Sequence, residues 1–292
     1  MGARYSVAKL YDESGQVASQ FTNDEFYSFC DSWEHAMEDE KFVEIIDTEL
    51  RAEGYANGPL DGLAAFAPSD RVRRFFLAWL AFIDEELEPW TTGGAIHFRP
   101  HWARVLMNAL VIGDAMGLPD ADLRAVAMAA VFHDSRRKSP YLDTGHGARA
   151  AAYYADACQS AAQWDAGVGT APLPKGAAAA NEGAFADLVY DPRAMLAIAW
   201  HDRDDEEGFE AIAQAVANDA APGTSGRTFT ESLPQGAQAD AATIFRIFKD
   251  SDGLDRVRLG EGGLDVRFLR TDQARSQVQF AQDLFATSTA LG

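Results

Sequence analysis

The sequence predicts an all-α fold, in which a helical bundle follows a mainly helical N-terminal part that carries one short β-hairpin. Three observations support this prediction. Apolar residues recur at the three- and four-residue spacing that places them on one face of a helix. Proline stands at the start of two such stretches, at Pro100 and Pro119. The 292 residues are 47% hydrophobic, which is enough to bury a substantial core.

The N-terminal part is expected to form a hairpin and then helices. Residues 4–21 are typical of a short hairpin with its turn at residues 13–16. Position 22 or 23 suits a helix N-cap, and a helical pattern runs from there to about residue 53. A second helical pattern covers about residues 69–87.

A loop near residue 90 divides the chain into two predicted parts. Residues 88–94 contain a proline with paired threonines and glycines, which indicates a boundary. We therefore assign residues 1–90 to an N-terminal extension of no recognised kind, and residues 91–292 to a main helical domain that ends in a C-terminal helix. Within that domain, residues 159–183 are expected to be an insertion or loop, because they are rich in alanine and glycine and contain two prolines.

The charge of the chain limits its partners. It has 45 acidic and 25 basic residues, a net charge of −20. Because a phosphate backbone binds basic patches, free nucleic acid is not an expected partner. The composition is typical of a strongly acidic or high-salt proteome, and any cluster of basic residues stands out against it.

The chain is expected to be a soluble, cytoplasmic protein. Its two cysteines, Cys30 and Cys158, are too few for a disulfide framework. It has no apolar run long enough to cross a bilayer and no signal-peptide core at its N-terminus, so no membrane partner is expected. An oligomer is compatible with the sequence, which leaves that state open.

Two buried histidines and a carboxylate are predicted in the first helices of the main domain. A helix that begins near Pro100 places His101 on the same face as the apolar Val105, so the imidazole should point into the core. The next helix, from Pro119 to about 132, is apolar nearly all round and delivers His133 and Asp134 at its C-terminal end. Since burial of an imidazole beside a carboxylate is costly unless something neutralises the pair, a divalent metal ion is a natural partner.

A further carboxylate is expected from the helix that ends near residue 255. Helical spacing places Asp252 on the apolar face with Phe248, whereas Asp250 shares its face with Arg246. We therefore predict that Asp252 is the ligand and that Asp250 faces solvent.

The order His101, then His133-Asp134, then Asp252 resembles the HD-domain superfamily of metal-dependent phosphohydrolases, whose pattern is H…HD…D on an all-helical scaffold. The surroundings are similar too, with His-x-x-Arg-Val from His101 and Lys-x-Ser-Asp-x-Leu-Asp around Asp252. Gly253 departs from an arginine that is frequent in the family. The resemblance covers about residues 95–260 and implies an HD-domain helical bundle.

The resemblance also implies a second metal ion. HD proteins with dinuclear sites follow the order H…HD…H…H…D, which His146 and His201 complete in this chain. By similarity, these two histidines would bind the second ion and Asp134 would bridge both. Four imidazoles and two carboxylates suit Mn²⁺, Fe²⁺, Zn²⁺ or Co²⁺ better than Mg²⁺.

The function implied is hydrolysis of a phosphomonoester or phosphodiester, nucleotide-like or a small phosphorylated metabolite, by a metal-activated hydroxide. The run Arg136-Arg137-Lys138 is the densest basic cluster in this acidic chain, and Arg104 lies one turn from His101. We expect these four residues to bind the substrate phosphate. Asp134, Arg137 and Lys138 are the expected catalytic residues.

Two alternatives to the phosphohydrolase belong to other classes. Some HD-fold proteins with the same six ligands are mixed-valent di-iron oxygenases that cleave C–C or C–P bonds, and the ligand pattern does not separate the two reactions. A non-catalytic, nucleotide-binding HD scaffold is the other alternative. Retention of all six candidate ligands disfavours it, because a scaffold has no need of a costly polar core.

Overall fold

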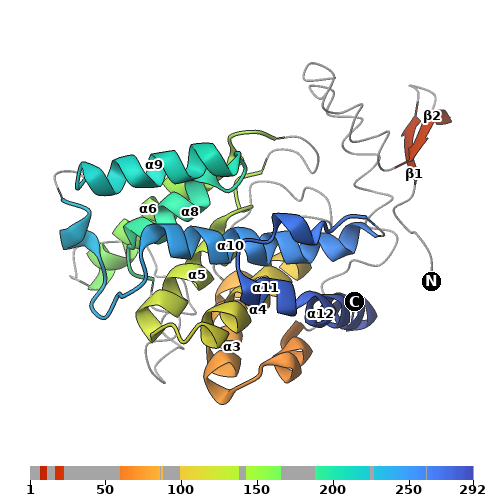
Figure 1. The fold of residues 1–292 in the computed structure, drawn as a ribbon, viewed down its shortest axis with the longest axis horizontal. Helices are drawn as coiled ribbons and strands as arrows, with labels where there is room; N and C mark the ends of the chain where they lie inside the picture. Colours follow the sequence, from red (N-terminus) through yellow and green to blue (C-terminus); the bar gives the residue numbers. More distant parts are fainter. Residues whose placement is uncertain are drawn as a thin grey trace.

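The computed structural model describes residues 7–11, 17–22, 60–85, 87, 99–137, 143–165, 188–223, 227–260 and 262–291. The predicted all-α class is confirmed (Figure 1). The α-helices are α3 (Asp70–Glu85), α4 (Arg99–Ala115), α5 (Asp120–Phe132), α6 (His146–Asp165), α8 (Pro192–Trp200), α9 (Asp205–Ala217), α10 (Ala241–Asp255), α11 (Asp272–Ser276) and α12 (Val278–Leu291). Short 3-10 helices are η2 (Leu60–Phe66), η4 (Thr230–Ser232), η5 (Arg256–Leu259) and η6 (Val266–Phe268).

The expected hairpin strands are present. Strands β1 (Val7–Tyr11) and β2 (Val17–Thr22) pair antiparallel, with Val7 opposite Thr22 and a register shift between Leu10 and Tyr11. The predicted turn at residues 13–16 lies outside the described residues, as do the predicted helix to residue 53 and the predicted boundary at 88–94.

Helix α10 crosses the middle of the bundle, with α6, α8 and α9 on one side and α3, α4 and α5 on the other (Figure 1). It packs directly against α4, α5 and α8. Helix α5 is buried along nearly its whole length, as its apolar, alanine-rich sequence predicts. Close approach of α4 to the start of α5 needs Gly113, because a Cβ atom there would lie 2.6 Å from Leu123 Cδ2.

Helix α3 confirms the pattern predicted for residues 69–87, and its apolar side packs on α4. Buried residues of η2 and α3, such as Leu63 and Phe76, belong to the same hydrophobic core as α4 and α12. The core therefore includes side chains from both sides of residue 90, while the division into an extension and a main domain stays a prediction.

The loop predicted for residues 159–183 is wrong for its first part. Helix α6 continues to Asp165, because alanine and glutamine after Cys158 are good helix formers and the first proline comes only at position 172. Residues 166–187 lie outside the described part of the chain. Among the described helices, none is both long and apolar enough to cross a bilayer.

A buried ion-pair network joins the starts of α5, α8 and α10. Arg193 in the first turn of α8 is 1% exposed, and its guanidinium binds Asp191 at 2.7 Å and Asp122 at 2.5 Å. Asp122 lies in the first turn of α5 and accepts a hydrogen bond from the backbone N–H of Ala239, just before α10. The starts of three helices are thus joined, and four of the six candidate ligands, His133, Asp134, His201 and Asp252, lie at or near the other ends of the same helices.

Candidate metal centre

All six predicted metal ligands come together in the bundle. His101 lies in the first turn of α4, and His133 with Asp134 follows the end of α5. His146 begins α6, His201 follows α8, and Asp252 lies in the last turn of α10. Each is buried except Asp252, whose side chain is 33% exposed. Their atoms form two groups that share Asp134.

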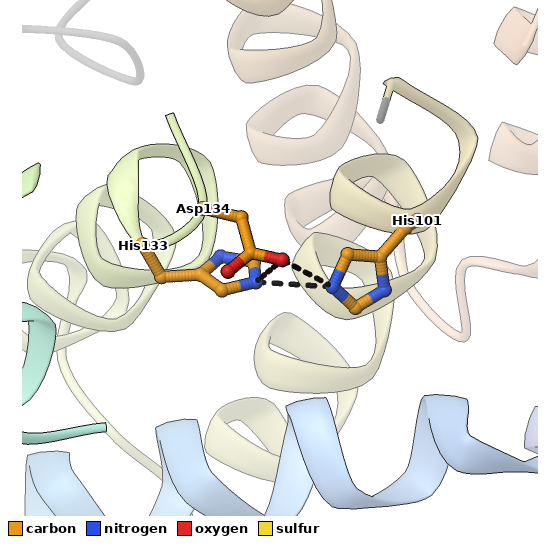
Figure 2. Close-up of side chains that lie close together, drawn as sticks. All are labelled: His101, His133 and Asp134. Carbon is orange, nitrogen blue, oxygen red and sulfur yellow. Dashed lines mark hydrogen bonds and ion pairs between the residues drawn. The ribbon is translucent and has the colours of Figure 1, made fainter. Parts of the chain in front are cut away.

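The first group contains His101, His133 and Asp134 (Figure 2). The two Nε2 atoms of the histidines lie 3.1 Å apart. Asp134 Oδ2 lies 3.5 Å from His101 Nε2 and 3.6 Å from His133 Nε2. Asp252 Oδ1 lies 3.5 Å from His101 Nε2, so the fourth predicted ligand reaches the same group.

The second group contains His146, His201 and again Asp134. The two imidazole Nε2 atoms lie 2.9 Å apart. The other oxygen of Asp134, Oδ1, lies 3.0 Å from His146 Nε2 and 3.5 Å from His201 Nε2. Each oxygen of the Asp134 carboxylate therefore faces one pair of histidines, which is the arrangement of a bridging carboxylate.

The hydrogen bonds of the Nδ1 atoms indicate which nitrogen of each imidazole carries the proton. Every Nδ1 atom lies within hydrogen-bond distance of an oxygen that can only accept, either a backbone carbonyl or an ionised carboxylate. These pairs are His101 with Asp255 Oδ2 at 2.7 Å, His133 with Ala130 O at 2.8 Å, His146 with Asp143 O at 2.6 Å and His201 with Ile198 O at 2.8 Å. Each Nδ1 therefore donates its proton outward, and in the neutral ring Nε2 keeps a lone pair that points at the group.

Two lone pairs that face each other repel, and a cation between them removes the repulsion. Two ligands at right angles on an ion with bonds of about 2.1 Å lie about 3 Å apart. The Nε2 separations of 3.1 Å and 2.9 Å match this distance. The buried donor set, two imidazoles and a carboxylate oxygen in each group, thus fits a divalent transition-metal ion.

Burial and neighbouring charges shift the pKa values of His133 and Asp134 toward the form that binds metal. Burial lowers the pKa of His133 to about 3, so this ring stays neutral. Although burial opposes the ionisation of Asp134, nearby His133 and Arg137 hold its pKa well below the usual range. For His101, burial lowers the pKa, but hydrogen bonds with Asp134 and Asp255 outweigh it and raise the pKa overall.

Two carboxylates beside the ligands were missed by sequence reasoning. Asp255 accepts the Nδ1 proton of His101 and is itself held by Arg104 Nε at 2.6 Å. Asp202 accepts a hydrogen bond of 2.5 Å from the backbone N–H of Gly145 and lies 3.4 Å from His146 Nδ1. Two signals could have revealed them: Asp255 lies one helical turn after Asp252, and Asp202 repeats the His-Asp dipeptide.

The predicted phosphate-binding residues have different surroundings. Arg137 lies at the second group, with Nη1 3.1 Å from His146 Nε2 and 3.4 Å from Asp134 Oδ1. The Arg136 guanidinium lies 3.3 Å from the centre of the Tyr153 ring. Lys138 lies outside the described residues.

Arg104 is 3% exposed and binds Asp255 and Ser288. This geometry gives Arg104 a role in orienting Asp255 behind His101. Its contact with a substrate phosphate stays a prediction, and one that its burial does not favour.

The prediction that Asp250 faces solvent and Asp252 lies on the buried face of α10 is wrong. Asp250 is fully buried and accepts hydrogen bonds from the backbone N–H groups of Arg270 at 2.7 Å and Thr271 at 2.8 Å. Helical spacing could not show this, because the chain after α10 folds back over the polar side of that helix. Asp252 is the more exposed of the two, yet its carboxylate lies at the first metal group as predicted.

A cavity of about 660 Å³ lies beside the two groups. His201 from the second group and Asp252, which reaches the first, both line it. It has further walls from residues 203–205, 249, 253, 256, 262–265 and 268–270. A small molecule in this cavity would contact two of the candidate ligands, His201 and Asp252.

No family model, curated protein or solved structure matches this chain.

Proposed function

We propose that this chain is a metal-dependent phosphohydrolase of the HD type, which binds two divalent ions and hydrolyses a small phosphomonoester or phosphodiester. One observation carries the proposal. Six residues that are far apart in sequence, in the order H…HD…H…H…D, meet as two groups on either side of Asp134. A structural core has no need of such a cluster, because buried polar groups destabilise a fold unless they are paired.

The ions would supply the Lewis acidity and the hydroxide nucleophile that phosphoester hydrolysis needs near pH 7. The chain supplies the remaining elements. Asp134 offers one oxygen to each pair of histidines and so fixes the distance between the two positions. The Arg137 guanidinium lies beside the second group, where it can stabilise negative charge that develops on a phosphoryl oxygen. The cavity opens beside the partly exposed Asp252, so the substrate can approach the metal centre from that side.

The setting proposed for this activity is the cytoplasm, with a small phosphorylated molecule as the partner. The net charge of −20 supports a small substrate over a nucleic acid, since a long phosphate backbone would be repelled by most of the surface. A small anion can still bind where the two ions and Arg137 provide local positive charge.

The first experiment is to measure metal content per chain on protein purified without oxygen or chelating tags, followed by a phosphoester screen with that metal. About two Mn, Zn or Co ions and turnover of a phosphoester would support the proposal. About two Fe ions with O₂ consumption, and no ester hydrolysis, would instead indicate the di-iron oxygenase. A chain that takes up no metal, even after metal is added back, would contradict both enzymes and leave the non-catalytic scaffold.

A variant pair makes the same experiment specific to the site. Asp134→Ala should abolish metal binding and turnover, and His133→Ala should lose the ion of the first group together with turnover, while circular dichroism shows the helical content of the wild type. Wild-type turnover in either variant would contradict the proposed centre.

A further inference from the structure

The cavity beside the metal centre has the size of a substrate site. Its volume of about 660 Å³ lies within the range of about 300–1,000 Å³ that is typical of small-molecule pockets. One of its sides is formed by His201 and Asp252, one residue from each metal group. A phosphoryl group at the ions would therefore leave the rest of its molecule inside this cavity.

The walls of the cavity are held in place before any ligand binds. Asp250 fixes the backbone at Arg270 and Thr271, and Arg270 also binds Asp205 at 2.6 Å. Lys249 also reaches Asp205, at 3.5 Å, and donates to the carbonyl oxygens of His201 and Arg203 at 2.9 Å each. Lys249 and Arg270 therefore stabilise the walls of the cavity.

Arg256 is the cation best placed to meet an anionic ligand. It follows Asp252 by four residues, so both lie on the same side of the chain as α10 passes into η5. The Arg256 Nε donates to Gly263 O at 2.9 Å, which is the single hydrogen bond of this guanidinium within the described part of the chain. The bond anchors the side chain to the cavity wall and leaves both terminal amino groups for a ligand.

Phe268 gives the same cavity an apolar face. It is 71% exposed, more than any other large hydrophobic residue in the described part of the chain, and it lines the cavity together with Leu264 and Leu269. An aromatic ring in water at the edge of a pocket offers a flat surface on which another ring can stack.

We propose that this cavity binds the organic group of a ring-bearing phosphoester, with Arg256 paired to a phosphoryl oxygen and Phe268 packed against the ring. The inference rests on the proposed function, because the metal centre positions the phosphoryl group. It adds a substrate class, phosphoesters with an aromatic or other flat ring, and two residues that select it.

The test is calorimetric binding of two ligands that a phosphoester hydrolase does not cleave, inorganic phosphate and phenylphosphonate, to the metal-loaded protein. Wild-type protein should bind phenylphosphonate more tightly, because only this ligand reaches Phe268. Phe268→Ala should weaken the binding of phenylphosphonate about tenfold and leave the binding of inorganic phosphate unchanged. Arg256→Gln should weaken both ligands about tenfold, because it removes a charge-assisted contact to the phosphoryl group.

The chain offers a matched control for each substitution. Val266→Ala also truncates an exposed apolar residue of η6, and Arg246→Gln removes a positive charge from the exposed side of α10, but neither residue lines the cavity. Both should bind the two ligands as the wild type does. Thermal unfolding of each variant confirms that the segment is folded, which is expected because Phe268 and Arg256 are exposed.

Failure of this inference and failure of the proposed function give different results. If Phe268→Ala and Arg256→Gln bind both ligands like their controls, or if wild-type protein does not distinguish the ligands, the cavity assignment is overturned even when the enzyme hydrolyses esters. If the variants lose binding as expected but no phosphoester is turned over, the cavity assignment holds and the hydrolase does not.

Discussion

At the scale of single residues, three of the four histidines among the candidate ligands are oriented by the same kind of local hydrogen bond. His133, His146 and His201 each direct Nδ1 at the carbonyl oxygen three residues earlier in the chain. For His133 and His201 that carbonyl belongs to the last turn of a helix, where backbone acceptors lack a partner. A histidine just past a helix end thus satisfies the backbone and presents Nε2 to the metal group.

The bridging position of Asp134 leads to a prediction about stoichiometry. Asp134→Ala removes a ligand from both groups, so the chain should lose both ions. His201→Ala weakens only the second group, so about one ion should remain. Elemental analysis of each purified variant measures this. Asp283→Ala, an acidic residue of α12 far from the ligands in sequence, is the control and should keep the wild-type metal content. Loss of both ions in His201→Ala would contradict two separable groups.

Asp255 is predicted to act through His101 and not as a ligand. Its carboxylate accepts the Nδ1 proton of His101, which orients the ring and makes Nε2 a better donor. Asp255→Asn should therefore lower metal affinity about 10–100-fold, as measured by competition with a chelator. Asp255→Glu keeps the charge and should restore part of the affinity.

Asp272→Asn, an exposed acidic residue paired with Arg275, is the control for this measurement. Unchanged affinity in Asp255→Asn would show that His101 needs no such partner.

At the scale of helices, the sequence predicted most elements of the bundle and the ligands that they carry. Helices α4 and α5 follow an apolar pattern that continues without interruption, so the burial of His101 and His133 could be predicted. The same reasoning failed at Asp250, because it considered α10 alone. The contacts of Asp250 come from residues 270–271, and helical spacing contains no information about a segment that returns from twenty residues away.

Two carboxylates of α10, Asp250 and Asp252, should separate stability from metal binding. Asp250→Asn weakens the acceptor for the backbone at residues 270–271 and the ion pair with Arg270, so it should lower the free energy of unfolding by about 1–3 kcal/mol. Its metal content should stay that of the wild type. Asp252→Asn should lower the metal content and leave the free energy of unfolding nearly unchanged, since its side chain is partly exposed and lies at the first metal group. Urea unfolding and elemental analysis measure the two effects, and equal effects of both variants on metal content would contradict the assignment.

At the scale of the whole molecule, the centre is assembled from five separate stretches of chain. The ligands come from residues 101, 133–134, 146, 201 and 252, and no two histidines of one group belong to the same helix. The order of these residues could be predicted from the sequence, but their distances could not. The cavity was not predicted at all, because its walls come from α10 and from the irregular segment that follows it.

Such a centre should couple metal binding to the stability of the fold. Without an ion, the Nε2 lone pairs of His101 and His133 face each other in the core, so metal should bind the folded chain far better than the unfolded one. A ligand at 100 times its dissociation constant adds about 2.7 kcal/mol to the free energy of unfolding. For a chain of this size, that corresponds to a rise in Tm of roughly 5 °C.

The rise in Tm should depend on pH, because protons compete with metal for the imidazoles. A histidine of ordinary pKa, about 6.5, is neutral at pH 7.5 and charged at pH 5. His133 should not limit binding, since burial lowers its pKa to about 3, whereas His101 has a raised pKa and should take up a proton early as the pH falls. The difference in Tm between metal-loaded and chelator-treated protein should therefore be present at pH 7.5 and nearly vanish at pH 5. Asp134→Ala should show little difference at either pH, and a wild-type difference as large at pH 5 as at pH 7.5 would mean that the ion is not held by histidines.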